Sequence, residues 1–293
     1  MEKKANLFLV GAMKAGTTSF VDVLSQHSQI YVPPIKEPHY FVDEMPIELY
    51  EPSRFFDLEK YFDKEFPKSL HISHLKTQAQ YEKLYSLSGD EEYRLDASTA
   101  YLHAPGVANR IFKYNPDATI IILTRDPMAR AFSHYKMDIG KGRVNQSFED
   151  LIRAELIQND ANNLSWHSYL GMSKYSNAIE NFREYFEKVL VISFEELKAN
   201  PKRILGELSG HLQITGFQFD ELEHKNVARK PKFQGLFYLL KKLGLKDYFS
   251  RIFSHTFKQW LFRATSTEEG FEIQLTKETL EKVNQFFEVH SRI

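Results

Sequence analysis

Three short stretches of the chain are apolar at successive positions, without the alternation of apolar and polar residues that a half-exposed strand shows. They are bounded by turn residues and comprise Leu7–Val10, Thr119–Thr124 and Val189–Phe194. Runs of this length and composition are typical of strands that are buried on both faces of a parallel sheet. We therefore predict three buried, parallel strands at these positions.

Helical periodicity appears between the predicted strands. In Lys174–Lys188, apolar residues recur at intervals of three and four, so one face of the helix is apolar. Ser147 and Asp150 resemble a capping box. Asn200 followed by Pro201 suits the N-cap and first position of a further helix. The remaining predicted helices are Thr17–Ser25, Pro127–Asp138 and Ser147–Gln158.

The alternation of strands and helices predicts the fold class. Strand–helix–strand connections favour an α/β fold with three layers, in which helices flank a central parallel sheet. The sequence contains no internal repeat, no low-complexity tract and no linker rich in Pro, Gly or Ser. We therefore predict a single domain over residues 1–293.

Composition narrows the class of protein. Lys plus Arg total 38 and Asp plus Glu total 39, for a net charge of −1, which argues against a general nucleic-acid coat. With no cysteine, the chain has no disulfide, thiolate zinc site or iron–sulfur cluster. The apolar run after Lys3 and Lys4 has no cleavage site of the signal-peptide kind, and no stretch reaches the roughly 18 to 20 apolar residues of a membrane helix. We expect a cytoplasmic location.

One segment departs from the near-neutral charge of the whole. Residues 225–263 contain ten basic residues and one acidic residue, a local charge of +9, with aromatic residues between the basic ones. This pattern is typical of one or two solvent-exposed amphipathic helices. It also fits a lid that binds an anion over an active site, a surface for an acidic acceptor, or a contact with a membrane surface.

The stretch from Gly11 to Ser19 has the composition of a phosphate-binding loop. A predicted strand leads into Gly11 and Gly16, five positions apart, and a helix then begins with hydroxyl residues. Glycines let backbone N–H groups approach an anion, and a helix N-terminus adds donors. The nucleotide-hydrolysing pattern G-x-x-x-x-G-K-[ST] is nearly met, but Thr17 stands in its lysine position and Lys14 lies within the loop. The alternative is that this strand–loop–helix junction has only a structural role and binds no phosphate.

A second candidate anion site follows the strand Thr119–Thr124. The strand delivers Arg125 at its carboxyl end, where ligands of open α/β sheets bind. Ser133 lies about two turns into the next helix. The guanidinium fork suits phosphate oxygens, and a serine hydroxyl can complete the site. A surface ion pair between Arg125 and Asp126 is the structural alternative.

Together these motifs resemble those of sulfotransferases that use 3′-phosphoadenosine 5′-phosphosulfate (PAPS). Residues 11–19 look like the loop that binds the 5′-phosphosulfate, and residues 123–135 are similar to the 3′-phosphate motif. Lys36–Phe41 resembles the glutamate-containing segment of the heparan-sulfate and glycan branch, and Asp96–Tyr101 resembles its Lys-Thr-Pro-Ala-Tyr-like segment. The resemblance spans residues 7–235 and implies a P-loop-like fold that binds PAPS.

The resemblance implies roles for residues at the donor. It implies that Lys14 stabilises the phosphate of the departing product, 3′-phosphoadenosine 5′-phosphate (PAP). Arg125 and Ser133 then bind the 3′-phosphate, and Arg229 and Lys230 close over it. The other donor-binding groups are backbone N–H groups and hydroxyls of five consecutive residues, Ala15, Gly16, Thr17, Thr18 and Ser19.

Attack by an acceptor hydroxyl requires a base, and two residues are candidates. Glu37 matches the position of the catalytic carboxylate in the resembling family. His39 is its rival, because small-molecule sulfotransferases usually employ a histidine. In an extended segment Glu37 and His39 point to the same face, so both can line the site. The alternatives without a catalytic role are that Glu37 is a solvent-exposed turn residue and that His39 has only a structural role.

One departure from the glycan branch bears on the acceptor. Where that branch has a lysine, this chain has Ala97 after Asp96. The sequence also shows no stretch like the membrane anchor of the Golgi enzymes. We therefore expect a soluble, bacterial-type enzyme that sulfates a hydroxyl of a saccharide, a lipid-linked sugar or a small metabolite, without a metal and without a nucleic-acid partner. Two other functions stay open: a magnesium-dependent nucleotide kinase or NTPase, and a non-catalytic module that binds phosphorylated or sulfated ligands.

Overall fold

The computed structural model describes residues 3–46, 49–53, 56–158, 166–218, 230–231, 266–267 and 272–288. The chain divides into two compact units, the first formed by residues 1–126 and 175–225 and the second by residues 127–174 and 226–293. The expectation of a single domain over residues 1–293 stays a prediction.

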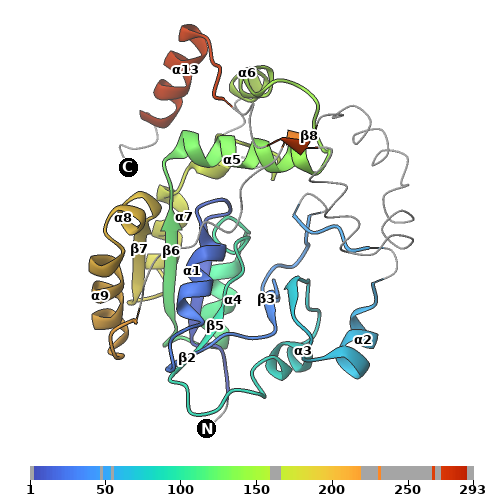
Figure 1. The fold of residues 1–293 in the computed structure, drawn as a ribbon, viewed down its shortest axis with the longest axis vertical. Helices are drawn as coiled ribbons and strands as arrows, with labels where there is room; N and C mark the ends of the chain where they lie inside the picture. The colour runs from blue at the N-terminus through green and yellow to red at the C-terminus, as the bar shows by residue number, and fades with distance from the viewer. Residues whose placement is uncertain are drawn as a thin grey trace. The chain divides into compact units, whose positions relative to one another are not determined.

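Parallel strands form the centre of the first unit (Figure 1). Among the described residues, five strands pair side by side, and every neighbouring pair is parallel. Their order across the sheet is β2 (Ile30–Tyr31), β5 (Tyr93–Asp96), β1 (Leu7–Gly11), β6 (Thr119–Thr124) and β7 (Val189–Ser193). All five residues of β1 are buried, as are the first five of β6, which explains their uninterrupted apolar sequences.

Helices flank this sheet, and Figure 1 shows α8 and α9 beside β7. They bury apolar faces, as α1 does through Phe20, Val21 and Leu24. The helices of the first unit are α1 (Thr17–Leu24), α2 (Leu58–Lys60), η1 (Tyr61–Glu65), α3 (Gln78–Lys83), α4 (Val107–Tyr114), α7 (Ser176–Arg183), α8 (Phe194–Ala199) and α9 (Pro201–Leu212). The predicted α/β fold with a parallel sheet flanked by helices is therefore confirmed.

A separate pair of short strands carries one of the candidate bases. β3 (Ile35–Glu37) and β4 (Leu70–Ile72) are parallel, and Glu37 is opposite Ile72. Ser73 N–H continues the pairing by donating to the carbonyl of Glu37 at 2.9 Å. Glu37 thus sits at the end of a strand whose position is fixed by backbone hydrogen bonds.

Two of the differences between predicted and observed element bounds have a local structural cause. Phe194 begins α8 instead of ending β7, because the Ser193 side chain caps the helix by accepting a hydrogen bond from Glu196 N–H. The helix predicted at Lys174–Lys188 covers only Ser176–Arg183. It ends early because the chain turns after Phe182 to bring Val189 into register with Ile120 of β6.

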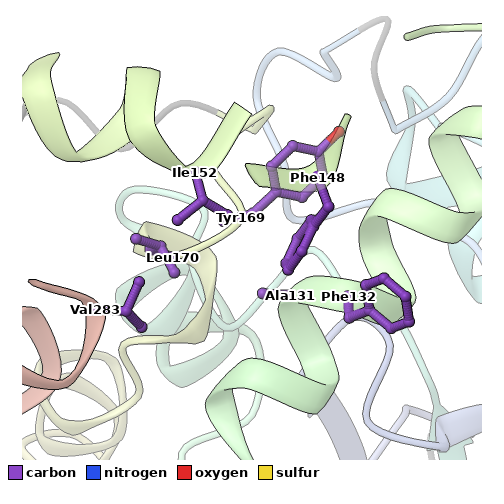
Figure 2. Close-up of a cluster of buried hydrophobic side chains, with 7 residues drawn as sticks. All are labelled: Ala131, Phe132, Phe148, Ile152, Tyr169, Leu170 and Val283. Atoms are coloured by element: carbon purple, nitrogen blue, oxygen red, sulfur yellow. The ribbon is translucent and has the colours of Figure 1, made fainter. Parts of the chain in front are cut away.

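The second unit has its own apolar cluster (Figure 2). Its elements are α5 (Pro127–Gly140), α6 (Phe148–Gln158), η2 (Gly171–Ser173), β8 (Lys230–Pro231), β9 (Ser266–Thr267) and α13 (Lys277–Glu288). The buried cluster consists of Ala131, Phe132, Phe148, Ile152, Tyr169, Leu170 and Val283. Val283 brings α13 into a cluster otherwise built by residues 131–170, so the cluster joins distant parts of the sequence.

One half of the predicted capping box is seen at the start of α6, where the Ser147 hydroxyl caps the backbone N–H of Asp150. The Ser147 hydroxyl accepts from Asp150 N–H at 3.1 Å and donates to the Asp150 carboxylate at 2.6 Å. In the segment 225–263, the structure describes only Lys230 and Pro231, which pair antiparallel with Ser266 and Thr267. The possible roles of that segment therefore stay predictions. No helix in the described ranges is long and apolar enough to span a membrane.

Candidate functional site

The predicted phosphate-binding loop connects β1 to α1. Lys14 and Gly16 have left-handed backbones, with φ of 72° and 88°, and Gly16 is the N-cap of α1. The first helical hydrogen bond runs from Phe20 N–H to the Gly16 carbonyl at 3.2 Å. The N–H groups of Thr17 and Thr18 precede that bond and lie at the open, electropositive end of the helix.

Both glycines of the loop are required by close contacts. A Cβ on Gly16 would lie 2.3 Å from Cε2 of Phe194, far inside van der Waals contact. A Cβ on Gly11 would lie 2.8 Å from Cβ of Leu102 and 3.3 Å from the carbonyl oxygen of Thr99. The loop backbone is therefore packed against α8 and against the segment after β5, with no room for side chains at either position.

Arg125, at the end of β6, contacts the same loop. Its Nη1 donates to the carbonyl oxygen of Lys14 at 3.1 Å, and its guanidinium lies 5.2 Å from the ring centre of Phe194, within cation–π range. The Nε of Arg125 is buried and has no hydrogen-bond partner among the described residues. The predicted phosphate-binding loop and Arg125 are thus joined directly, and Phe194 packs against both.

Glu37 is buried, with 7% of its surface exposed. One carboxylate oxygen, Oε1, lies 2.8 Å from the Lys36 ammonium. The other, Oε2, accepts a hydrogen bond from the Thr99 hydroxyl at 2.8 Å and lies 3.5 Å from Nε2 of His39. The exposed ring of His71 lies 3.9 Å from Oε1. The carboxylate is therefore surrounded by donors and cations.

These neighbours keep the Glu37 carboxylate ionised. Burial alone would raise the pKa of Glu37, but the charge and hydrogen bond of Lys36, together with His39 and the Thr99 hydroxyl, lower the pKa to about 2. A hydrogen bond to the charged form of an acid favours that form. Glu37 is consequently a negatively charged acceptor at neutral pH.

His39 is fully enclosed beside Glu37. Burial lowers the pKa of His39 to about 4, and the attraction of the Glu37 carboxylate offsets only part of that effect. Its Nδ1 faces the carbonyl oxygen of Ser73 at 3.2 Å, and its backbone is left-handed with φ of 48°. The neutral ring is therefore the main form of His39 at neutral pH.

Thr99 links the loop to Glu37. Its carbonyl oxygen lies against Gly11, and its hydroxyl donates to Glu37. Thr99 is buried and has 8% of its surface exposed. The loop and the carboxylate therefore share a neighbour, although 26 positions separate Gly11 from Glu37 in the chain.

For the remaining predicted site residues other than Arg229, the structure gives the loop or element in which each lies. Ala15, Thr17, Thr18 and Ser19 lie in the loop and the first turn of α1. Ser133 is half-buried on α5 of the second unit, Lys230 lies in β8, and Arg229 is outside the described residues. Their roles toward a 3′-phosphate stay predictions. In the described ranges, no group of three or more His, Asp or Glu side chains forms a metal site.

Three residues at the site were missed by sequence reasoning. The sequence pattern predicts Phe194 as the last residue of a strand, and the motifs include Thr99 and Lys36 without assigning a contact to either. Thr99 and Phe194 reach the site through contacts between residues far apart in the sequence. For Lys36, the adjacent opposite charges of Lys36 and Glu37 are a signal that could have been used.

Comparison with known proteins adds independent findings. A family model described as "Sulfotransferase family" matches residues 6–219. The chain is 25% identical over 212 residues to a bifunctional heparan sulfate N-deacetylase/N-sulfotransferase of Drosophila melanogaster, which covers 70% of this chain and 19% of that protein. It is 22% identical over 196 residues to human heparan sulfate glucosamine 3-O-sulfotransferase 5, covering 66% and 49% of the two chains.

The chain spans half or less of the length of these two relatives. Among solved structures, a sulfotransferase from Alicyclobacillus acidocaldarius is similar with a TM-score of 0.58 and 29% identity. That similarity covers 74% of this chain and 84% of the other.

Proposed function

The chain belongs to the sulfotransferase family, and we propose that it transfers the sulfuryl group of PAPS to a hydroxyl group of an acceptor. The observation that carries this proposal is the hydrogen bond from Arg125 to the carbonyl oxygen of Lys14. It joins the loop proposed for one end of the nucleotide to the arginine proposed for the other. A donor with phosphates at both ends needs such a pair of sites.

The described residues fit a phosphorylated donor. Gly11 and Gly16 let the loop backbone pack closely against Leu102 and Phe194, and α1 presents its N-terminus at this loop. The buried Nε of Arg125, which has no partner among the described residues, is a donor suited to a phosphate oxygen. We propose that N–H groups and hydroxyls of residues 15–19 hold the 5′-phosphate, and that Ser133, Arg229 and Lys230 join Arg125 at the 3′-phosphate.

PAPS supplies a sulfuryl group that is activated by its bond to a phosphate. Lys14 supplies the cation that stabilises negative charge as that bond breaks. Its backbone is held by Arg125 through the carbonyl oxygen, so the side chain extends from a fixed point. Preorganised donors aimed at developing charge are among the largest catalytic effects of proteins.

Glu37 acts as the general base in this proposal. Because its pKa is about 2, its carboxylate is ionised at neutral pH and accepts the proton of the acceptor hydroxyl as the oxygen–sulfur bond forms. His39, with a pKa of about 4, lines the same site as a neutral ring. Burial of both side chains excludes water from the point of proton transfer.

The acceptor class is proposed from similarity to known proteins. Two relatives are named for heparan sulfate, which supports a saccharide acceptor, and a small hydroxylated metabolite is the alternative within the same chemistry. No metal has a role in this proposal. A cytoplasmic location also remains a proposal.

Calorimetric titration with PAP tests the donor site. We expect PAP to bind in EDTA as well as in magnesium, and Arg125→Ala to weaken binding by about 10- to 150-fold, because a hydrogen bond to a charged group contributes about 1.5 to 3 kcal/mol. Arg183→Ala is the matched control, since Arg183 pairs with Glu180 on the exposed face of α7. Binding of ATP only in magnesium, with no binding of PAP, would instead favour the kinase or NTPase function.

Transfer itself is measured with ³⁵S-labelled PAPS and three acceptor conditions: a heparosan oligosaccharide, p-nitrophenol, and water alone. Label in either acceptor, with release of PAP, supports the proposed reaction. PAP binding without transfer under any condition, and without any effect of Glu37→Gln, would favour a non-catalytic binding module.

The pairing of Lys36 with Glu37 predicts a change in pH dependence. Lys36→Met removes the ammonium that holds the pKa of Glu37 down, so the pKa rises and the acidic limb of kcat/KM moves to higher pH. We expect the acidic limb that reports Glu37 to lie at higher pH in the variant than in wild type. Profiles are compared with Lys68→Met, whose ammonium lies near Glu65 on the surface. An identical profile for wild type and Lys36→Met would remove Glu37 as the base.

A further inference from the structure

Asp96 is a buried carboxylate that the proposed reaction does not use. It ends β5 and is opposite Phe8 of the central strand β1. None of its surface is exposed. Its Oδ2 accepts hydrogen bonds from the hydroxyls of Tyr81 at 2.8 Å and Tyr101 at 2.9 Å, and its Oδ1 accepts from Ser98 at 2.6 Å. Such a fully hydrogen-bonded group can act as a fixed reference point.

Two of these three hydroxyls also hold the segment that follows Glu37. Ser98 Oγ accepts a hydrogen bond from the backbone N–H of His39 at 3.0 Å. The Tyr101 hydroxyl accepts from the N–H of Phe41 at 3.3 Å. Among the described contacts, the Tyr81 hydroxyl accepts no hydrogen bond from residues 39–41. Two separate arms therefore run from Asp96 to the backbone of residues 39–41.

The carboxylate fixes the direction of each hydroxyl. Burial raises the pKa of Asp96, and the hydrogen bonds from Ser98, Tyr81 and Tyr101 limit the rise to about 6. At neutral pH the carboxylate is therefore mainly ionised and only accepts hydrogen bonds. Ser98 and Tyr101 thus point their protons at Asp96 and their lone pairs at the backbone N–H groups. Burial and the charge of Asp96 raise the pKa of Tyr101 well above its usual value, so this hydroxyl keeps its proton. A side chain with a donor at this position would force one hydroxyl to turn round.

The held segment needs such support. His39 adopts a left-handed backbone, with φ of 48°, which is costly for a residue with a side chain and persists where the surroundings impose it. That conformation places Nε2 of His39 at 3.5 Å from Oε2 of Glu37. The position of His39 beside the proposed base therefore depends on contacts made by its backbone.

We infer that Asp96 is a positioning residue for the reaction at Glu37, because its carboxylate orients the hydroxyls of Ser98 and Tyr101 that hold the backbone of His39 and Phe41. The inference rests on the proposed function. It assigns Asp96 no contact with donor or acceptor, and its effect reaches the reaction only through the geometry of residues 39–41.

Three single-hydroxyl variants separate positioning from general stability. Ser98→Ala and Tyr101→Phe each remove one hydroxyl from Asp96 and one acceptor from the held segment. Tyr81→Phe also removes a hydroxyl from Asp96, at nearly the same distance, but removes no acceptor from that segment. Asp96→Asn tests the carboxylate directly, and the hydroxyl variants keep the inference testable if that protein fails to fold.

The first readout needs no turnover. Hydrogen–deuterium exchange is followed in a peptide that covers residues 38–42. We expect Ser98→Ala and Tyr101→Phe to speed the exchange of the His39 and Phe41 amides by about tenfold or more, and Tyr81→Phe to leave it unchanged. Equal exchange rates in all variants and wild type would contradict the inference that Ser98 and Tyr101 hold the backbone of residues 39–41.

The second readout is turnover of ³⁵S-labelled PAPS with the acceptor that gives the highest transfer, or with water if neither accepts. We expect kcat to fall about 10- to 100-fold in Ser98→Ala, Tyr101→Phe and Asp96→Asn, since small displacements of reacting groups cost rate, while the Kd of PAP changes by less than about twofold. Tyr81→Phe should retain the wild-type kcat.

The outcomes distinguish the inference from the proposed function. If Tyr81→Phe lowers kcat as much as Tyr101→Phe does, Asp96 has only a structural role and the inference is wrong. If Ser98→Ala and Tyr101→Phe keep the wild-type kcat, the inference is also wrong. Wild-type protein that binds PAP but releases none from PAPS under any condition would overturn the proposed function, and the exchange data would still decide whether the two arms hold residues 39–41.

Discussion

Glu37→Gln is expected to lower kcat by about 10²- to 10⁴-fold, the usual contribution of a positioned general base. Glutamine keeps the size of the side chain and can still accept the hydrogen bond from Thr99, but it cannot take up the proton of an acceptor hydroxyl. PAP binding is expected to stay close to the wild-type value, because the proposed donor ligands lie in the loop and at Arg125. Steady-state transfer from ³⁵S-labelled PAPS and calorimetry with PAP provide the two measurements.

Two further variants are compared with Glu37→Gln, one as a matched control and one as a test of the rival base. Glu65→Gln makes the same chemical change at a carboxylate on η1 that pairs with Lys68, and it should leave kcat unchanged. His39→Asn addresses the rival base. A protein in which His39→Asn loses the activity and Glu37→Gln keeps it would assign proton transfer to the histidine.

Lys14→Met is expected to lower kcat by about 10²- to 10³-fold, the effect of removing one group that stabilises charge in a transition state. The substitution removes the ammonium and keeps a side chain of similar length. It also keeps the carbonyl oxygen that accepts the Arg125 hydrogen bond, so the loop should still bind PAP. The expected pattern is therefore a large loss in kcat and a small change in the Kd of PAP.

The control for Lys14→Met is Lys60→Met, at an exposed position of α2, which should behave as wild type. Weaker PAP binding with an unchanged kcat would contradict the role proposed for Lys14. Lys14 would then bind the donor equally in the ground state and the transition state.

The parts of the fold that could be predicted are those in which burial of a segment requires a run of apolar residues in the sequence. β1 and β6 lie at the centre of the sheet, and their apolar runs gave their positions within one residue. β5 was not predicted, because Tyr-Arg-Leu-Asp mixes polar and apolar residues at half-buried and buried positions over four residues. β2 has only two residues, too few for any periodicity to appear.

The candidate site likewise contains residues that could be predicted from the sequence and residues that could not. The glycine loop and Arg125 could be predicted because each lies next to a strand whose end fixes its position. The neighbours of Glu37 could not, because Thr99 and Glu37 are 62 positions apart and only the tertiary fold brings them together. The same holds for the two arms from Asp96, since nothing local to residues 96–101 indicates which backbone groups their hydroxyls will meet.

The contact between Gly16 and Phe194 limits how this sequence can diverge. A Cβ at position 16 would occupy space that the phenylalanine ring fills, and the same ring lies beside the Arg125 guanidinium. A side chain could appear at position 16 only after position 194 had become smaller, and that first change would remove the aromatic face beside the arginine. Along an evolutionary lineage the two positions are therefore expected to stay fixed together, even though they are 178 positions apart in the chain.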